Sequence, residues 1–225
     1  MESNDVSKFL EIQKKAYVKK KISEYISKGF DEKTASNKAS QSWRSYVGKM
    51  LEKIIFESLK EPLEKQGLKL VTDNDLIRNR NLTKELELVK RLISIDYGEY
   101  LFLPDADIIV YKVTKKKAID ELDENDIKIL AIISVKNSFR ERGFETAYWK
   151  KKLSESIITS HIKVFMATPD PDNEISYIAP NHKPKKMRVI LEYELDGIYL
   201  LKNEFDETKK TKHFDEIAND ILSIK

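Results

Sequence analysis

Apolar residues recur every three or four positions through the first third of the chain, which is the spacing that places them on one face of a helix. Glycine and aspartate mark the ends of these patterns, because glycine ends helices and aspartate begins them. The patterns predict a helix from about residue 5 to Gly29, a short helix over 32–40 beginning at Asp31, a longer one over 42–65 ended by Gly67, and another over 82–93.

From residue 100 onward the pattern changes to short apolar runs bounded by turn residues, which is typical of strands. Two further helices are expected over 140–158 and 214–224. This order predicts an α/β protein, with a central mixed β-sheet flanked by helices and a helical N-terminal region. The expected strands are 100–103, 105–112, 128–136, 161–168, and 187–201 broken by a hairpin turn at Asp196-Gly197.

Composition and missing motifs exclude several kinds of chemistry. The 225 residues include no Cys, so there is no disulfide framework and no thiolate zinc site, and a reducing compartment such as the cytoplasm is expected. The first residues are acidic and polar, unlike a secretory signal, and no apolar run approaches the roughly 20 residues that span a bilayer, so no membrane partner is expected. The three His are scattered, and no phosphate-binding loop or GxSxG motif is present. Catalysis would therefore depend on carboxylates, Lys and a hard metal ion.

Charge does not decide whether the partner is a nucleic acid. The 41 basic residues are nearly balanced by 38 acidic ones, which leaves a net charge of +3. The informative segments are 103–111 and 129–136, where an acid begins one predicted strand and a lysine ends the next. Phosphodiester cleavage needs carboxylates that bind Mg²⁺, and it benefits from a cation near the scissile phosphate. Asp105 would be the ligand and Lys136 the cation.

Antiparallel pairing of these two strands selects Asp105 and Lys136 from several similar fragments. It places the start of one strand beside the end of the other, with residue 105 opposite 135 and 112 opposite 128. Ser134 and Lys136 then share one face of the sheet, as Asp105 and Asp107 do. The alternative motif Asp126-Ile127-Lys128 would lie at the opposite end. A purely structural ion pair at the strand ends is the competing interpretation.

This hairpin resembles the core of PD-(D/E)xK nucleases, in the variant where Ser replaces the second acid. The resemblance covers roughly residues 42–168 and is most specific over 103–149. It implies a type II restriction endonuclease that hydrolyses double-stranded DNA with Mg²⁺, with 42–225 as the nuclease domain. Residues 1–41 would then be a helical extension for dimerisation or DNA contact.

The same resemblance implies further acids, because the neutral hydroxyl of Ser134 cannot supply the second metal charge. The family adds an acid on an earlier helix in a G-x-x-x-E setting, which Gly48 and Glu52 match. Some members take the missing carboxylate from a later helix, where Glu145 is the nearest candidate and Glu155 a second choice. Each of these acids has the alternative interpretation of an ordinary surface carboxylate.

The residues after Lys136 are candidates for DNA recognition. Arg140, Glu141 and Arg142 are similar to the R-(D/E)-R element of restriction enzymes that read CCGG-like sites, and Arg offers the fork that matches guanine in the major groove. An exposed helix start with local ion pairs is the alternative. Asn137, Ser138 and Lys150 are the other expected DNA contacts.

Two partners are expected besides the DNA. Cleavage of a palindromic duplex requires two active sites related by a two-fold axis, so a homodimer is expected. A cognate DNA methyltransferase would be a functional partner. Two alternative functions remain open at this point: a structure-selective nuclease of the repair or junction-resolving kind, and a nucleic-acid-binding module of the same fold that has lost catalysis.

Overall fold

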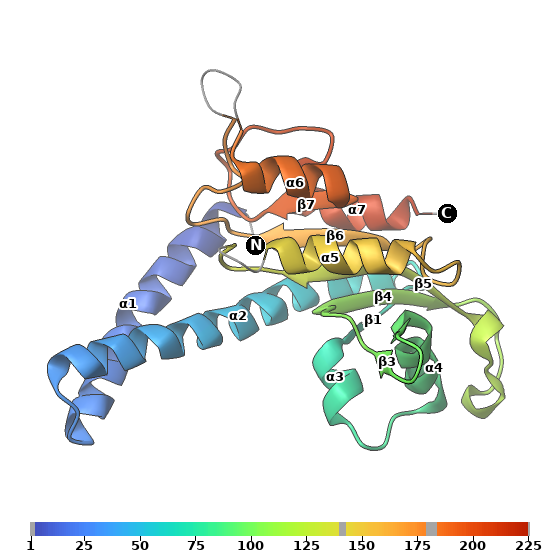
Figure 1. Cartoon of the computed structure of the whole chain (residues 1–225), viewed down its shortest axis with the longest axis horizontal. Coiled ribbons are helices and arrows are strands. Elements are labelled where there is room, and N and C mark those ends of the chain that lie inside the picture. The colour runs from blue at the N-terminus through green and yellow to red at the C-terminus, as the bar shows by residue number, and fades with distance from the viewer. Residues whose placement is uncertain (1–2, 140–142, 179–183, 225) are drawn as a thin grey trace.

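The computed structural model describes residues 3–139, 143–178 and 184–224, and it shows a mixed sheet between two layers of helices (Figure 1). The strands β1, β4 and β5 are antiparallel neighbours, whereas β5, β6, β7 and β8 run parallel. This confirms the predicted fold class. The six strands, in their order across the sheet, are β1 (Lys69–Thr72), β4 (Ile108–Val113), β5 (Ile127–Val135), β6 (Lys163–Thr168), β7 (Gly197–Leu200) and β8 (Thr211–His213).

Helices cover both faces of the sheet, and each face has its own apolar core. One core joins α3, α4, α5 and α6 to the sheet, and the other joins α1, α2 and α7 to it. A separate pair of short strands, β2 and β3, precedes β4. The α-helices and the other two strands are α1 (Ser3–Ser27), α2 (Glu32–Glu64), α3 (Asp73–Arg78), α4 (Lys84–Ile93), β2 (Ile95–Asp96), β3 (Leu101–Phe102), α5 (Gly143–Ser154), α6 (Lys186–Glu194) and α7 (Ile217–Leu222), and short 3-10 helices occur at Ile119–Glu121, Glu124–Asp126 and Phe214–Glu216.

The helix α2 is one continuous element of 33 residues, so the predicted break near residue 41 is wrong. The Asp31 side chain accepts a hydrogen bond from the backbone N–H of Thr34 and caps the helix as expected. Buried residues then recur every four positions from Ala35 to Leu63. Four residues turn a helix slightly more than once, so this buried row winds around α2. It faces α1 near the N-terminus of α2 and the sheet near the C-terminus.

The predicted hairpin at Asp196-Gly197 is also wrong, because the segment before it is the helix α6 and β7 runs parallel to β6. Parallel neighbours need a crossover connection, which α6 provides. The sequence carries the matching pattern, since Met187, Leu191 and Leu195 are buried at a spacing of four residues. Apolar side chains between these positions made the segment resemble a strand.

The β4–β5 pairing follows the predicted register at one end and shifts by one residue at the other. Lys112 lies opposite Lys128 as predicted, but an irregularity between Val110 and Tyr111 places Ile108 opposite Ile133. The shift brings Asp107 to the end of β5, where it accepts a hydrogen bond from the backbone N–H of Val135. None of the helices described carries enough consecutive apolar residues to span a bilayer.

Candidate active site

One edge of the sheet collects the ends of several strands and carries the acidic residues. β1 and β5 end there and β4 begins there, as the antiparallel pairings require. Asp73 is the first residue of α3, directly after β1, and Asp105 and Asp107 precede β4. Lys136 follows β5, and its backbone N–H donates to the Ala167 carbonyl, which extends the parallel pairing with β6 by one residue.

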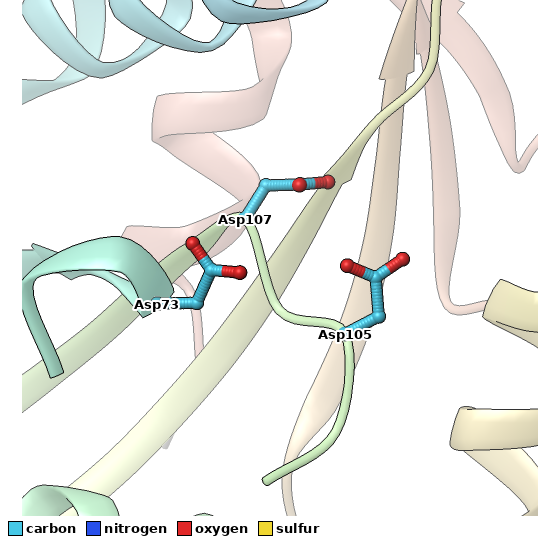
Figure 2. A group of neighbouring side chains, drawn as sticks. All are labelled: Asp73, Asp105 and Asp107. Atoms are coloured by element: carbon cyan, nitrogen blue, oxygen red, sulfur yellow. The ribbon is translucent and has the colours of Figure 1, made fainter. Parts of the chain in front are cut away.

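Three carboxylates converge at this edge. Asp73, Asp105 and Asp107 each offer an oxygen atom, and these atoms lie within 4.8 Å of one another. Figure 2 shows the three side chains pointing toward a common space, with Asp73 at the start of its helix and the other two on the segment that leads into β4. Asp107 is nearly buried, and the other two carboxylates are more accessible.

Lys136 joins this cluster from the neighbouring strand. Its Nζ donates a hydrogen bond to Asp105 Oδ2 at 2.8 Å and lies 3.7 Å from Asp107 Oδ2. Only 9% of the lysine side chain is exposed, so the ammonium is held in a protein environment and not in bulk water. The predicted meeting of Asp105 and Lys136 is confirmed.

Burial and neighbouring charge raise the pKa of two of these carboxyl groups, Asp107 and Asp73. Burial raises the pKa of Asp107 to about 7, with the Asp105 charge adding to the rise and Lys136 opposing it. Burial and the Asp105 charge also raise the pKa of Asp73. For Lys136, burial alone would lower the pKa, but the charges of Asp107 and Asp105 outweigh it and raise the pKa. One ammonium therefore does not balance the negative charge of this edge.

The cluster fits a divalent cation with a preference for oxygen ligands. Three carboxylate oxygens from three separate positions converge, and hard cations such as Mg²⁺ and Ca²⁺ are bound by such oxygens. No His or Cys belongs to the group, which argues against a zinc site. A bound cation would favour the charged forms of Asp73 and Asp107, whose pKa values are raised mainly by burial and further by the charge of Asp105.

The two helix acids expected at the site both lie near it, but outside the converging group. Glu52 is half-buried on α2, and burial together with the charge of Asp73 raises its pKa, while Lys136 opposes this rise. Glu145 is exposed in the first turn of α5, and its charge acts on Lys136. Glu155 forms an ion pair with Lys152 beyond the end of α5. Glu52 is thus the acid most closely coupled to the cluster.

Ser134 occupies the position of the missing acid and points away from solvent. It is 1% exposed, and its Oγ lies 3.1 Å from Oγ1 of Thr146 on α5. This contact links α5 to β5 two residues before Lys136. In this geometry Ser134 is buried and makes a side-chain contact with a neighbouring helix.

The residues expected to contact DNA lie in different parts of the chain, and the structure describes only some of them. Arg140, Glu141 and Arg142 lie outside the described residues. Asn137 and Ser138 follow Lys136 and are half-buried. Lys150 donates to the Asp196 carboxylate at 2.6 Å and to the Ile162 carbonyl at 3.2 Å. These partners lie where β6 and β7 begin, at the opposite end of the sheet from Lys136, so the position of Lys150 favours a structural role.

Asp73 is the site residue that the sequence patterns did not reveal. Its segment reads as an apolar run followed by Thr72-Asp73-Asn74-Asp75, and Thr72 and Asp75 form a capping box that begins α3. The sequence signal at this position is a short strand followed directly by a capping box, which indicates where a helix begins. That signal gives no partner strand, so it could not place Asp73 beside Asp107. The strand pattern places Asp107 on the same face as Asp105 but does not indicate a function for it.

Comparison with known proteins identifies clear relatives. Residues 85–221 match the family model described as BsaWI restriction endonuclease type 2. The chain is 61% identical over 224 residues to MjaVIP of Methanocaldococcus jannaschii, covering 100% of this chain and 95% of the relative. It is 45% identical over 182 residues to HpyAORF263P of Helicobacter pylori, covering 79% of this chain and 86% of the relative. Both relatives are named as candidate type II restriction enzymes.

A solved structure supports the fold independently. The chain resembles the restriction endonuclease in a PspGI–substrate DNA complex with a TM-score of 0.53 and 20% identity, covering 93% of this chain and 73% of the other. At this identity the likeness concerns the fold alone. It agrees with the mixed sheet and its two helical layers.

Proposed function

We infer the reaction at the acidic edge from the premise that this chain belongs to the BsaWI family of type 2 restriction endonucleases. It is accordingly a type II site-specific deoxyribonuclease. Enzymes of this kind generally use a divalent metal ion, and we propose Mg²⁺ as the ion for this chain. The observation that carries the proposal is the convergence of Asp73, Asp105 and Asp107 beside Lys136.

The proposed ligands are the three converging aspartates, with Glu52 as a supporting acid. When bound, Mg²⁺ would polarise a phosphate oxygen and make its bound water more acidic. Asp107 is oriented for ligation by the hydrogen bond from the Val135 N–H, and Asp105 by the Lys136 ammonium. Glu145, expected from the sequence as the replacement acid, lies outside the converging group, so we assign it to the surroundings of Lys136 instead.

Lys136 is proposed to position the attacking water and the scissile phosphate. Lys136 directly follows β5, and its ammonium lies beside the carboxylates of Asp105 and Asp107, so it has little freedom to move. Such a preorganised cation stabilises negative charge that develops on the phosphate oxygens. Ser134 is proposed to support this lysine indirectly, through its contact with Thr146.

DNA recognition is proposed for the segment after Lys136. Asn137 and Ser138 follow the catalytic strand directly, and Arg140, Glu141 and Arg142 continue from them in sequence. The forked guanidinium groups suit guanine edges in the major groove. We leave Lys150 out of this set because its ammonium already binds Asp196 and the Ile162 carbonyl.

Several features of the biological unit follow as proposals. A homodimer would present two acidic edges to the two strands of a palindromic site. Residues 1–41, which include α1, are proposed as an extension of the nuclease domain 42–225 that contacts DNA or the second protomer. A methyltransferase of the same specificity would protect the host DNA, and cleavage of incoming DNA places the enzyme in the cytoplasm.

Digestion of a sequenced supercoiled plasmid tests the proposed function. With Mg²⁺ the protein is expected to give discrete fragments with ends at one recurring sequence, and EDTA is expected to abolish them. Asp105→Asn and Lys136→Ala should abolish cleavage, whereas the exposed Asp215→Asn should not. Cleavage that persists in Asp105→Asn would contradict the proposed site, and cleavage restricted to branched DNA would contradict the restriction activity.

A further inference from the structure

The hairpin of α1 and α2 extends from the body on the side that carries the acidic edge. In Figure 1 the arrowheads of β6 and β7 point toward the side from which this hairpin projects. Because β5 runs parallel to β6, the Lys136 end of β5 faces the same side. The N-terminal half of α2 therefore continues past the acidic edge, where DNA bound for cleavage would lie.

The face of α2 that carries Glu52 can be followed toward the N-terminus by helical geometry. At about 100° per residue, positions 49, 48, 45, 41, 38 and 37 lie within about 60° of position 52. Leu59 and Leu63 lie within about 20° of the same direction and are buried in the core that α2 shares with the sheet, so this side of the helix faces the sheet and its acidic edge. We call these residues the arm face: Asn37, Lys38, Gln41, Ser45, Gly48 and Lys49.

The arm face carries no negative charge. Residues 33–51 contain no Asp or Glu but include three Lys and one Arg, whereas residues 52–64 contain four Glu. Asn37, Gln41, Ser45 and Lys49 are exposed. A Cβ atom added at Gly48 would meet nothing within 4 Å, so no other part of the described protein covers the helix there.

We propose that the arm face binds the sugar-phosphate backbone of the duplex beside the cleavage site. This inference rests on the proposed function, because it needs DNA held at the acidic edge. Lys38 and Lys49 supply positive charge, Asn37, Gln41 and Ser45 supply hydrogen-bond donors, and Gly48 leaves room for close approach. DNA interfaces are polar and positively charged, as this face is.

The reach of the arm sets which base pairs it contacts. Gln41 and Asn37 precede Glu52 by 11 and 15 residues. At about 1.5 Å per residue, the face extends roughly 16 to 22 Å from Glu52. With about 3.4 Å of duplex axis per base pair, an arm that lies along the DNA would reach about five to seven base pairs from the cleavage position.

A second protomer is the competing occupant, and the composition of the face argues against it. The core of a protein interface is apolar and depleted of charged residues. None of the arm-face residues is among the exposed large apolar side chains of the described chain. Tyr46, the exposed aromatic residue nearest to it on α2, stacks on Tyr17 of α1 at a centroid distance of 4.6 Å.

Charge-matched double variants test the proposal. Gln41→Glu/Ser45→Glu places two carboxylates on the arm face, and Gln66→Glu/Ser58→Glu makes the same chemical change at exposed positions near the other end of α2. Affinity is measured by fluorescence anisotropy in EDTA. The probes are duplexes that carry the site mapped with the wild-type enzyme, with flanks of 2 or 15 base pairs on each side.

The arm-face variant is expected to bind the long duplex about tenfold more weakly at moderate salt, because each carboxylate near a phosphate costs roughly threefold in affinity. It should lose less affinity for the short duplex, which offers fewer phosphates along the arm, and should still cleave the plasmid at the same sequence at low salt. The control variant should match the wild type on both duplexes.

Three results would overturn the proposal. Equal weakening by both double variants would show a general effect of charge. Weakening that is independent of flank length, together with a changed mass in light scattering, would show that the face binds a second protomer. Unchanged affinity of the arm-face variant for the long duplex would show that DNA does not reach the face. Failure of the proposed function looks different, because then the wild type itself would cleave no plasmid.

Discussion

The ammonium group of Lys136 lies 2.8 Å from the carboxylate of Asp105, although 31 residues separate the two in sequence. The same ammonium lies 3.7 Å from Asp107, so one cation faces two acids at the end of a buried strand. Removing it leaves the carboxylate cluster without its internal counter-charge.

Lys136→Ala is therefore expected to lower the free energy of unfolding in EDTA by on the order of 1 to 3 kcal/mol, because it leaves a partly buried acid cluster uncompensated. Ca²⁺ binds such clusters and should restore more stability to this variant than to the wild type. Urea denaturation with and without Ca²⁺ measures both effects. The exposed Lys60→Ala serves as the control and should respond to Ca²⁺ like the wild type. Absence of Ca²⁺ stabilisation in all three proteins would count against a cation site.

Asp73→Asn is expected to reduce plasmid cleavage at least about 100-fold, because a lost metal ligand removes on the order of 3 kcal/mol of charge stabilisation. Its matched control is Asp75→Asn, two residues later. Asp75 belongs to the capping box of α3 and does not belong to the acid cluster.

The control should therefore lose stability, by about 1 kcal/mol, while it keeps most of its cleavage rate. Cleavage rates and urea denaturation of both variants separate the two roles. Equal cleavage rates for Asp73→Asn and Asp75→Asn would exclude Asp73 from the metal site.

Glu52→Gln is expected to slow cleavage about tenfold. It removes a charge that acts on the cluster from outside the group of three converging carboxylates. Glu57→Gln makes the same change on the exposed side of α2 and should leave the rate unchanged. Single-turnover cleavage at saturating enzyme makes the comparison. A rate for Glu52→Gln equal to that of Glu57→Gln would assign Glu52 to the surface.

Ser134→Ala is expected to keep cleavage within about threefold of the wild type and to cost about 1 kcal/mol of stability, the usual contribution of a buried hydrogen bond. Thr146→Ala removes the other partner of this contact. A double-mutant cycle on urea denaturation should show that the two costs are coupled. A loss of cleavage of 100-fold in Ser134→Ala would instead assign the hydroxyl to the reaction.

Asp196 provides a test of pH dependence at the opposite end of the sheet. Burial alone would raise its pKa, but hydrogen bonds from Lys150, the Val164 N–H and Lys163 outweigh it and lower the pKa. A carboxyl whose folded pKa is lowered contributes stability above its ordinary pKa of about 4, and this contribution is lost as the pH falls below that value.

Asp196→Asn should therefore be less stable than the wild type at pH 7, by on the order of 1 kcal/mol. The difference should shrink at pH 3, and urea denaturation at both pH values measures it. DNA affinity should stay unchanged in Asp196→Asn and in Lys150→Met, because this ion pair is remote from the acidic edge. A strong loss of DNA affinity in Lys150→Met would restore the DNA contact expected from the sequence.

The sequence alone determined the features that depend on neighbouring stretches of chain. The apolar runs of β4 and β5 lie close in sequence and pair antiparallel, so their lengths and end residues predicted the meeting of Asp105 and Lys136. Helical spacing predicted α4 and the face of α2 that carries Glu52. These predictions succeeded because side-chain periodicity within an element, and the pairing of two adjacent strands, are local properties.

Only the tertiary structure decided which distant segments meet. Asp73 reaches the cluster because β1 pairs with the far side of β4, and the preceding sequence contains no information about that partner. The segment before β7 became a helix because β6 and β7 are parallel and need a crossover. The spacing of apolar residues predicts that a side chain is buried. Which helix or strand packs against that side chain depends on the folding of the whole chain.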